Sequence, residues 1–197
     1  KMKPDVFADI IATSALYRPG PLEGGMVMEY VDVKHRRREP TKVHPIVDAV
    51  LEETYGVMVY QEQVQQIAMK LASYTAGGAD LLRRAMGKKK PEEMAKQKAI
   101  FLEGAAKNKH DATKAEKLFD LMANFAGYGF NKSHAAAYSV ITCQTAFLKA
   151  HYPVEFYATL LSTERENTDK ITKYIADARR HHIEVLPPDI NESDTDF

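Results

Sequence analysis

Hydrophobic residues recur at helical spacing along almost the whole chain. In the segment 61–74, Val64, Ile67, Ala68 and Leu71 are three or four positions apart, which places them on one face of a helix. The same spacing predicts helices over residues 5–16, 26–33, 155–163 and 169–182, from Pro45, around Arg83, from Pro91, before Phe125, and from Ser133 toward Pro153. Two short apolar runs remain. Residues 57–60 are predicted to form a strand or a buried turn, and residues 183–186 a short strand. The pattern predicts a mainly α fold with at most short strands.

Glycine, proline and capping residues predict where these helices begin and end. We expect Pro19 and Pro21 to break the first helix, Gly77 and Gly78 to separate two helices, and Gly87 to end the second. Proline suits the first position of a helix, as at Pro45 and Pro91. At the N-terminal ends, a capping box is predicted at residues 113–116, Ser133 as an N-cap, and Thr168 at the head of the last helix.

Composition adds a few limits. The 197 residues carry no formal net charge, so no overall attraction to nucleic acid is expected, although residues 34–42 are basic and residues 184–197 acidic. A single cysteine, Cys143, excludes an internal disulfide and fits a reducing compartment. Without an apolar run of about 20 residues or a signal peptide, we expect a cytoplasmic protein that contacts no membrane. A chain that opens on Lys1 and stops without a closing element is interpreted as part of a longer protein.

The first chemical candidate is the cationic run within residues 77–94. It concentrates like charges, which is most easily tolerated where an anion binds. Adjacent arginines on a helix diverge by about 100°, so only one of the two is expected to face a given ligand. The alternative is a solvated helix with a solubilising tail. The cations of this run are Arg83, Arg84, Lys88, Lys89 and Lys90.

A second candidate lies where a glycine-containing loop leads into a helix. If Ser133 caps that helix, the following amides point outward and can bind a phosphate. Asn131, Lys132 and His134 flank this end, with Tyr128 and Tyr138 nearby in the sequence; the alternative is a capped helix with an exposed histidine. Residues 60–63 are either polar contacts near a ligand or merely a helix start.

Catalytic machinery is not apparent. The sequence has no convincing serine–histidine–acid set, no glycine-rich phosphate loop and no closely spaced aspartates on a strand that would hold two magnesium ions. His181 and His182 point in different directions on a helix and have no third ligand nearby, so we expect no metal site. The residues therefore predict phosphate binding without a means of breaking a phosphate bond.

Six motifs occur in an order that resembles a known family. They lie at residues 15–22, 55–63, 79–88, 130–138, 148–153 and 186–191. Together they closely resemble the alpha subunits of bacterial DNA polymerase III, the C-family replicative polymerases, over essentially the whole chain. The resemblance implies a DNA-directed DNA polymerase, with residues 1–187 as its helical fingers domain and residues 188–197 as the start of a duplex-binding region.

The resemblance also implies roles for individual residues. The incoming deoxynucleoside triphosphate (dNTP) would contact Arg83, Arg84, Lys88, Asn131, Lys132, Ser133 and His134, and its base or sugar would pack on Tyr128 and Tyr138. Contacts to the DNA backbone would come from Arg18, Arg36, Arg37, Arg38, Lys89 and Lys90. No catalytic or metal-binding residue is expected here, because the family's Mg2+ is bound by palm aspartates outside this chain. The fragment alone is therefore expected to be inactive.

The resemblance further implies template-primer DNA, dNTPs and the remaining polymerase domains as partners, and, in the holoenzyme, a proofreading exonuclease, a sliding clamp and a clamp loader. Two alternatives stay open. One is a non-catalytic helical module that binds nucleic acid or protein. The other is the fingers domain of an error-prone C-family paralogue, which these residues do not distinguish from a replicative one.

Overall fold

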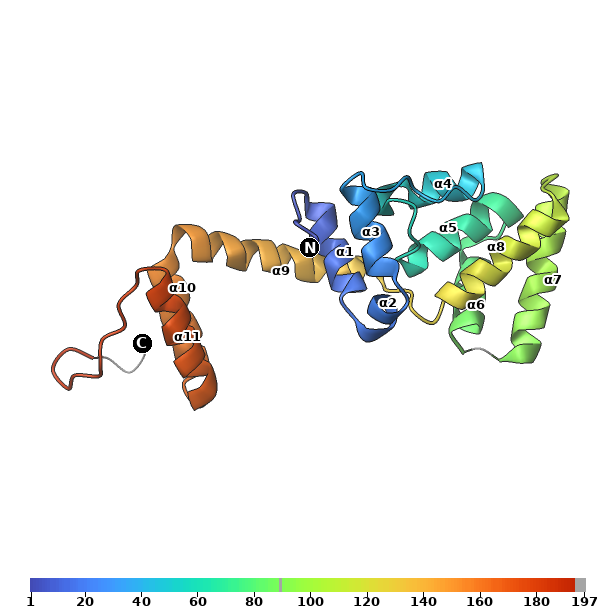
Figure 1. Ribbon diagram of the computed structural model, residues 1–197. Helices are drawn as coiled ribbons and strands as arrows, with labels where there is room; N and C mark the ends of the chain where they lie inside the picture. The colour runs from blue at the N-terminus through green and yellow to red at the C-terminus, as the bar shows by residue number, and fades with distance from the viewer. Residues whose placement is uncertain (89, 194–197) are drawn as a thin grey trace. The chain divides into compact units, whose positions relative to one another are not determined.

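The computed structural model describes residues 1–88 and 90–193, and helices make up most of them (Figure 1). The 3-10 turn η1 spans Glu52–Thr54, and residues 57–60 lie outside regular secondary structure, apart from one parallel bridge between Tyr60 and Phe130. The described residues contain no strand, so the mainly α prediction is confirmed. The short strand predicted at residues 183–186 is wrong, because this segment is coil and pairs with no other described segment. The α-helices are α1 (Phe7–Leu16), α2 (Pro19–Glu23), α3 (Met26–Lys34), α4 (Pro45–Leu51), α5 (Gln61–Ala72), α6 (Ala76–Lys88), α7 (Pro91–Lys107), α8 (Ala112–Phe125), α9 (Lys132–His151), α10 (Pro153–Thr163) and α11 (Thr168–Arg180).

The chain divides into two compact units, Lys1–Ser139 and Val140–Phe197, and the boundary falls within α9. Each unit is described by itself. The predicted division at residue 187 stays a prediction.

The first helix ends at Leu16, before Arg18, as predicted. The segment after Arg18 is itself helical, because Pro19 occupies the first position of α2. Other predicted helix ends are wrong. Gly77 and Gly78 lie in the first turn of α6 and Gly87 lies inside its last turn, so none of them marks a helix boundary. Asp111 and Asn167, rather than Thr113 and Thr168, cap α8 and α11, with their side chains accepting the amides of Lys114 and Lys170.

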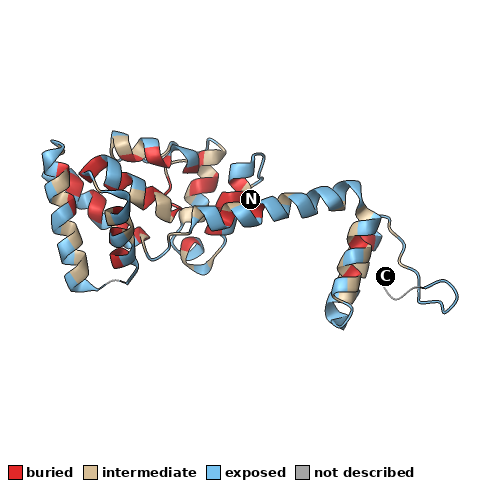
Figure 2. Cartoon of the chain, turned by 180° about the vertical axis from the view of Figure 1, so that it is seen from behind, coloured by how far each residue is buried: buried red, intermediate tan, exposed pale blue. Residues whose placement is uncertain are grey.

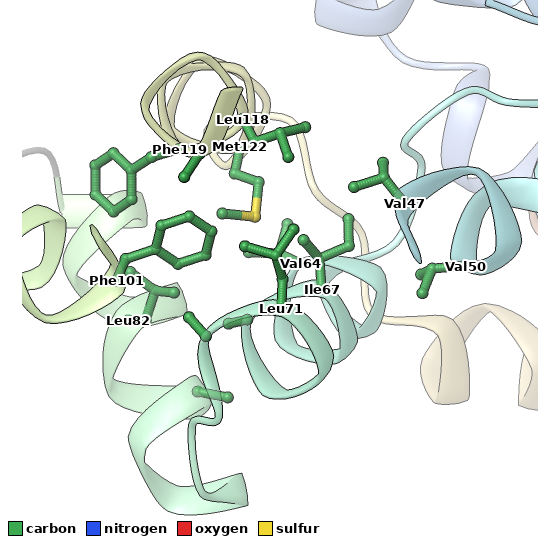
Figure 3. Packing of buried hydrophobic residues seen from close by; sticks show 14 of the residues in the cluster. Val47, Val50, Val64, Ile67, Leu71, Leu82, Phe101, Leu118, Phe119 and Met122 are labelled. Atoms are coloured by element: carbon green, nitrogen blue, oxygen red, sulfur yellow. The ribbon is translucent and has the colours of Figure 1, made fainter. Parts of the chain in front are cut away.

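The larger hydrophobic core is built around α5 (Figure 3). Val64, Ile67 and Leu71 are buried on α5, as their spacing predicts, and they pack among side chains of α4, α6, α7 and α8. On the α7–α8 side, the rings of Phe101 and Phe119 lie with centroids 5.6 Å apart. This core fixes α6 against α5, and thereby sets where the charged side of α6 lies.

A second core cluster joins α1, α3 and the segment 57–60 to the first turn of α9, and it includes Ala135. Figure 2 colours the buried residues of the chain red. A buried glutamine shapes this region. The Gln63 Oε1 atom accepts the amides of Val59 and Tyr60 at 2.8 and 2.9 Å, while its Nε2 donates to the Thr54 hydroxyl. Gln63 thus satisfies two backbone donors of a segment outside regular secondary structure.

In the unit Val140–Phe197, α10 and α11 pack on each other. Asp177 on α11 accepts hydrogen bonds from Lys149 and from the hydroxyl of Tyr157, at 2.7 and 2.6 Å. These contacts, led by Lys149, lower the pKa of Asp177 to about 2.

Candidate phosphate-binding site

The two arginines of α6 contact the same carboxylate, but their guanidinium groups differ in their contacts and exposure. Arg83 donates from Nε and Nη2 to Asp80 Oδ1 at 3.0 and 2.8 Å, and from Nη1 to Gln61 Oε1 at 3.3 Å. Arg84 contacts Asp80 Oδ2 through Nε at 2.7 Å. The exposed fraction of the side chain is 27% for Arg83 and 62% for Arg84. Arg84 therefore has the more accessible guanidinium.

Asp80 lies one helical turn before both arginines, the spacing at which side chains on a helix meet. The Arg83 guanidinium, followed by that of Arg84, lowers the pKa of Asp80 below its usual value. The carboxylate is therefore ionised at neutral pH and accepts hydrogen bonds from both arginines and from Gln65.

The other cations of this run lie where α6 ends and α7 begins. Lys88 is the last residue of α6 and is exposed. Lys90 caps α7 and lies 3.5 Å from Glu93, while Lys89 is outside the described residues.

The start of α9 differs from its prediction at one residue. Ser133 is the second residue of the helix, and the Asn131 side chain acts as the cap, accepting the amide of His134 at 2.7 Å. Asparagine serves this role as well as serine. The prediction that Ser133 is the N-cap is wrong, whereas the predicted helix start beside Lys132 and His134 is present.

A carboxylate already occupies this helix start. Glu62 on α5 accepts the Lys132 amide at 3.1 and 3.0 Å and the Asn131 side chain at 2.8 Å. The Lys132 ammonium pairs with Glu53 and lies 5.5 Å above the centre of the Tyr60 ring. The seat expected for a phosphate is thus held by anions of the chain itself.

Aromatic side chains surround the same loop. His134 is exposed and lies between Phe130 and Tyr138, with ring centroids 5.8 and 4.9 Å away. Tyr128 packs against Gly20 so closely that a Cβ atom there would lie 2.4 Å from its ring. Tyr138 is 59% exposed, so much of its side chain faces solvent.

One residue joins the two candidate regions. Gln61 accepts a hydrogen bond from Arg83, and its Nε2 donates to the Gly129 carbonyl at 3.0 Å. Its backbone amide donates to the Phe130 carbonyl at 2.9 Å. Regions that are far apart in the sequence are therefore connected through the first residue of α5.

Arg18 has structural partners. It donates to the carbonyls of Ala15 and Tyr128 at 2.7 and 2.6 Å, and its guanidinium lies 4.7 Å from the centre of the Phe130 ring. Burial lowers the pKa of Arg18. Arg18 thus tethers the residue 128–130 loop to α1, and its predicted DNA contact stays a prediction.

The basic loop after α3 is a separate surface. Arg37 and Arg38 pair with Asp32 and Glu29 at 3.4 and 3.3 Å, and Arg36 has a backbone φ of 57°. Within residues 1–88 and 90–193, no hydrogen bond or ion pair links Arg36, Arg37 or Arg38 to α6 or to the start of α9.

Sequence reasoning missed the carboxylates of this site. Asp80 stands three and four positions before the arginines, so its pairing with them was predictable from helix geometry. Glu62 and Gln61 belong to the segment 60–63, whose interpretation as a helix start is confirmed, because α5 begins at Gln61; its contact with a ligand stays a prediction. Their partners lie about seventy residues away, which local spacing does not reveal.

The arrangement combines guanidinium groups, an ammonium group, helix amides and exposed rings, which suits a phosphorylated ligand with an aromatic base. Across the described residues, no three His, Cys, Asp or Glu side chains gather to hold a metal ion. That the Mg2+ implied by the resemblance is bound outside this chain stays a prediction. In the same part of the chain, no helix is both long enough and apolar enough to cross a membrane.

Comparison with known proteins identifies the family. The family model for the bacterial DNA polymerase III alpha subunit finger domain matches residues 1–109, which include α6 and the start of α5. The chain belongs to this family. The DNA polymerase III alpha subunit of Escherichia coli K12 is 54% identical over 97% of the chain, and that of Haemophilus influenzae is 55% identical over the same share. The subunit of Pseudomonas aeruginosa is 51% identical over the whole chain.

These relatives are much longer proteins. The chain spans 17% of the length of each of the three. It therefore corresponds to part of a DNA polymerase III alpha subunit and includes a finger-domain match over residues 1–109, in agreement with the resemblance drawn from its six motifs. The pairwise alignments extend beyond residue 109 and so cover α9 as well as α6.

Proposed function

We propose that this chain binds the triphosphate of the incoming dNTP and contacts template-primer DNA during DNA-templated 5'-3' synthesis by a polymerase III alpha subunit. In this proposal, Arg83, Arg84 and Lys88 form one wall of the nucleotide site. The other wall consists of Asn131, Lys132, Ser133 and His134, and Tyr128 and Tyr138 pack against the base or sugar. The Mg2+ ions, held by residues outside the chain, would neutralise phosphate charge and activate the primer hydroxyl.

The connection made by Gln61 is the observation that carries this proposal. The two alternatives to a binding site are a solvated run of charges on α6 and a capped start of α9 without a ligand. Neither alternative predicts a hydrogen-bonded link between the two regions. Here, a single side chain bonds both to Arg83 and to the loop that starts α9. Cations on both sides of a polyanion neutralise it and fix its orientation, which is what an in-line phosphoryl transfer needs from its surroundings.

Within the first wall, we assign the direct phosphate contact to Arg84. The three nitrogen atoms of the Arg83 guanidinium donate hydrogen bonds to Asp80 and Gln61, whereas Arg84 contacts Asp80 through Nε at 2.7 Å and its side chain is 62% exposed. Arg84 can therefore present its two terminal nitrogens to phosphate oxygens, a geometry that guanidinium groups favour. Arg83 acts as a positioning residue that holds α6 to Gln61.

The exposed basic loop supports the second part of the proposal. Arg36, Arg37 and Arg38, with Lys89 and Lys90, would contact DNA phosphates without reading base sequence. Cytoplasmic location, assembly with the other polymerase domains and, in the holoenzyme, with exonuclease, clamp and clamp loader belong to the same proposal. A module that binds nucleic acid alone, without preference for triphosphates, is the alternative.

The test uses the complete polymerase subunit that contains this chain. Arg84→Ala removes a charge-assisted contact worth about 1.5–3 kcal/mol, so the KM for dNTP should rise by roughly tenfold or more. Because the donors of Arg83 are committed to Asp80 and Gln61, Arg83→Ala should also lower the thermal midpoint, which Arg84→Ala should leave nearly unchanged. The matched control is Arg179→Ala, an exposed arginine on α11. A dNTP KM in Arg84→Ala equal to that of the control would refute the proposal.

A further inference from the structure

Three cationic groups of the proposed nucleotide site, those of Arg83, Arg84 and Lys132, are paired with carboxylates of the chain itself. Asp80 engages both arginines of α6. Glu62 accepts the Lys132 amide, and Glu53 pairs with the Lys132 ammonium. These three acids come from three elements, α6, α5 and η1, so the pairing is not a by-product of one acidic stretch.

The exposure of these groups allows exchange. Glu53 and Lys132 have side chains that are 42% and 38% exposed, and Asp80 is 32% exposed. Ion pairs this close to solvent are weak, because water and salt screen them. A triphosphate carries several negative charges and many acceptor oxygens, so it can replace a single carboxylate at each cation.

We propose that Asp80, Glu62 and Glu53 are internal counter-ions. Without nucleotide, they hold the side-chain charges of Arg83, Arg84 and Lys132 and the Lys132 amide in place, and the incoming triphosphate displaces them from these groups. The inference rests on the proposed function. The counter-ions keep the guanidinium and ammonium groups in fixed positions between binding events. They also lower the apparent affinity for nucleotide, because a ligand must compete with the contact that it replaces.

Amide substitutions separate the charge from the geometry. Asp80→Asn keeps one oxygen acceptor, enough for the Arg83 hydrogen bonds to a single oxygen, and Glu62→Gln keeps one for the Lys132 amide, so in each case a hydrogen bond can persist. What disappears is the negative charge that competes with phosphate. If the acids serve only to hold the structure, the amides should leave nucleotide binding unchanged or weaken it.

The experiment measures the equilibrium affinity for a complementary dNTP in the complete subunit, bound to a primer-template whose primer ends in a dideoxynucleotide, so that no bond forms. The variants are Asp80→Asn, Glu62→Gln and Glu53→Gln. The matched control is Glu103→Gln, which removes one negative charge from an exposed ion pair with Lys107 on α7. The thermal midpoint of each variant establishes that it is folded.

We expect each of the three variants to bind dNTP roughly two- to fivefold more tightly than the parent protein, the fold-change that corresponds to a weak ion pair. The control should stay within experimental error. Affinities that fall, or that match the control, would overturn the inference. If Asp80→Asn or Glu62→Gln lowers the thermal midpoint, Glu53→Gln decides, since Glu53 is exposed and pairs with a side chain.

The outcome is separable from failure of the proposed function. If Arg84→Ala and Lys132→Ala leave dNTP affinity unchanged, the site itself is wrongly assigned. If those two variants weaken binding while the amide variants fail to tighten it, the site stands and the counter-ion inference is wrong.

Discussion

Replacing Gly104 with alanine should destabilise the unit Lys1–Ser139, although the same change in an open helix is stabilising. A Cβ atom at Gly104 on α7 would lie 2.1 Å from the carbonyl oxygen of Ala72 and 2.9 Å from its carbonyl carbon. Both are backbone atoms at the end of α5, so the helices must separate by about 1 Å to restore ordinary contact. Asn108 resists this movement, because its side chain donates to the Leu71 carbonyl and the Ser73 hydroxyl at 2.9 and 2.8 Å.

The magnitude follows from two opposing effects. Overpacking a close helix contact costs up to about 3 kcal/mol, while alanine gains about 1 kcal/mol over glycine in a helix. The net loss of about 2 kcal/mol should lower the thermal midpoint, followed by circular dichroism, by roughly 4–8 °C. Gly87→Ala is the matched control, since a Cβ atom there has no neighbour within 4 Å, and it should be neutral or stabilising. A Gly104→Ala midpoint equal to or above that of the parent chain would refute the reasoning.

Two further predictions concern single polar side chains. Gln63→Leu leaves the amides of Val59 and Tyr60 without their acceptor, so it should cost about 3 kcal/mol of unfolding free energy and speed hydrogen exchange at both amides. Gln66→Leu, at an exposed position of the same helix, should do neither, and equal effects of the two substitutions would contradict the assignment. Because the pKa of Asp177 is lowered to about 2, the stability it contributes is present above the unfolded pKa near 4 and is lost as pH falls from there toward 2. Across this pH range, the free energy of unfolding measured with urea should fall less for Asp177→Asn than for the parent chain. An equal fall in the two proteins would exclude the effect.

Periodicity predicted the helices well because it reports burial directly. Val64, Ile67 and Leu71 are spaced for one face of α5, and all three are buried in the core. Helix starts were predicted less well, because several residues near each start are able to cap. At α9, α8 and α11, a serine or threonine is predicted as the N-cap, yet an asparagine or aspartate one or two positions earlier forms the cap. Gly77 and Gly78 are predicted to separate two helices and Gly87 to end one, yet all three lie inside α6.

The sequence pattern indicates the cations of the candidate site but not the hydrogen bonds that connect its two regions. The positions of Arg84 and Lys132 follow from local helix geometry, whereas the contacts of Gln61 and Glu62 depend on how α5 packs beside the start of α9. The spacing of residues along one segment carries no information on such long-range contacts. The exception is Asp80, whose pairing with both arginines follows from positions within a single helix.

The central claim is that the Arg84 side of α6 serves the nucleotide more than the DNA. Its most direct test compares two quantities in the complete subunit with Arg84→Ala, the KM for dNTP and the Kd for template-primer DNA at fixed salt. We expect the dNTP KM to rise by roughly tenfold or more, while the DNA Kd changes by less than about threefold. A large loss of DNA affinity with an unchanged dNTP KM would contradict the claim.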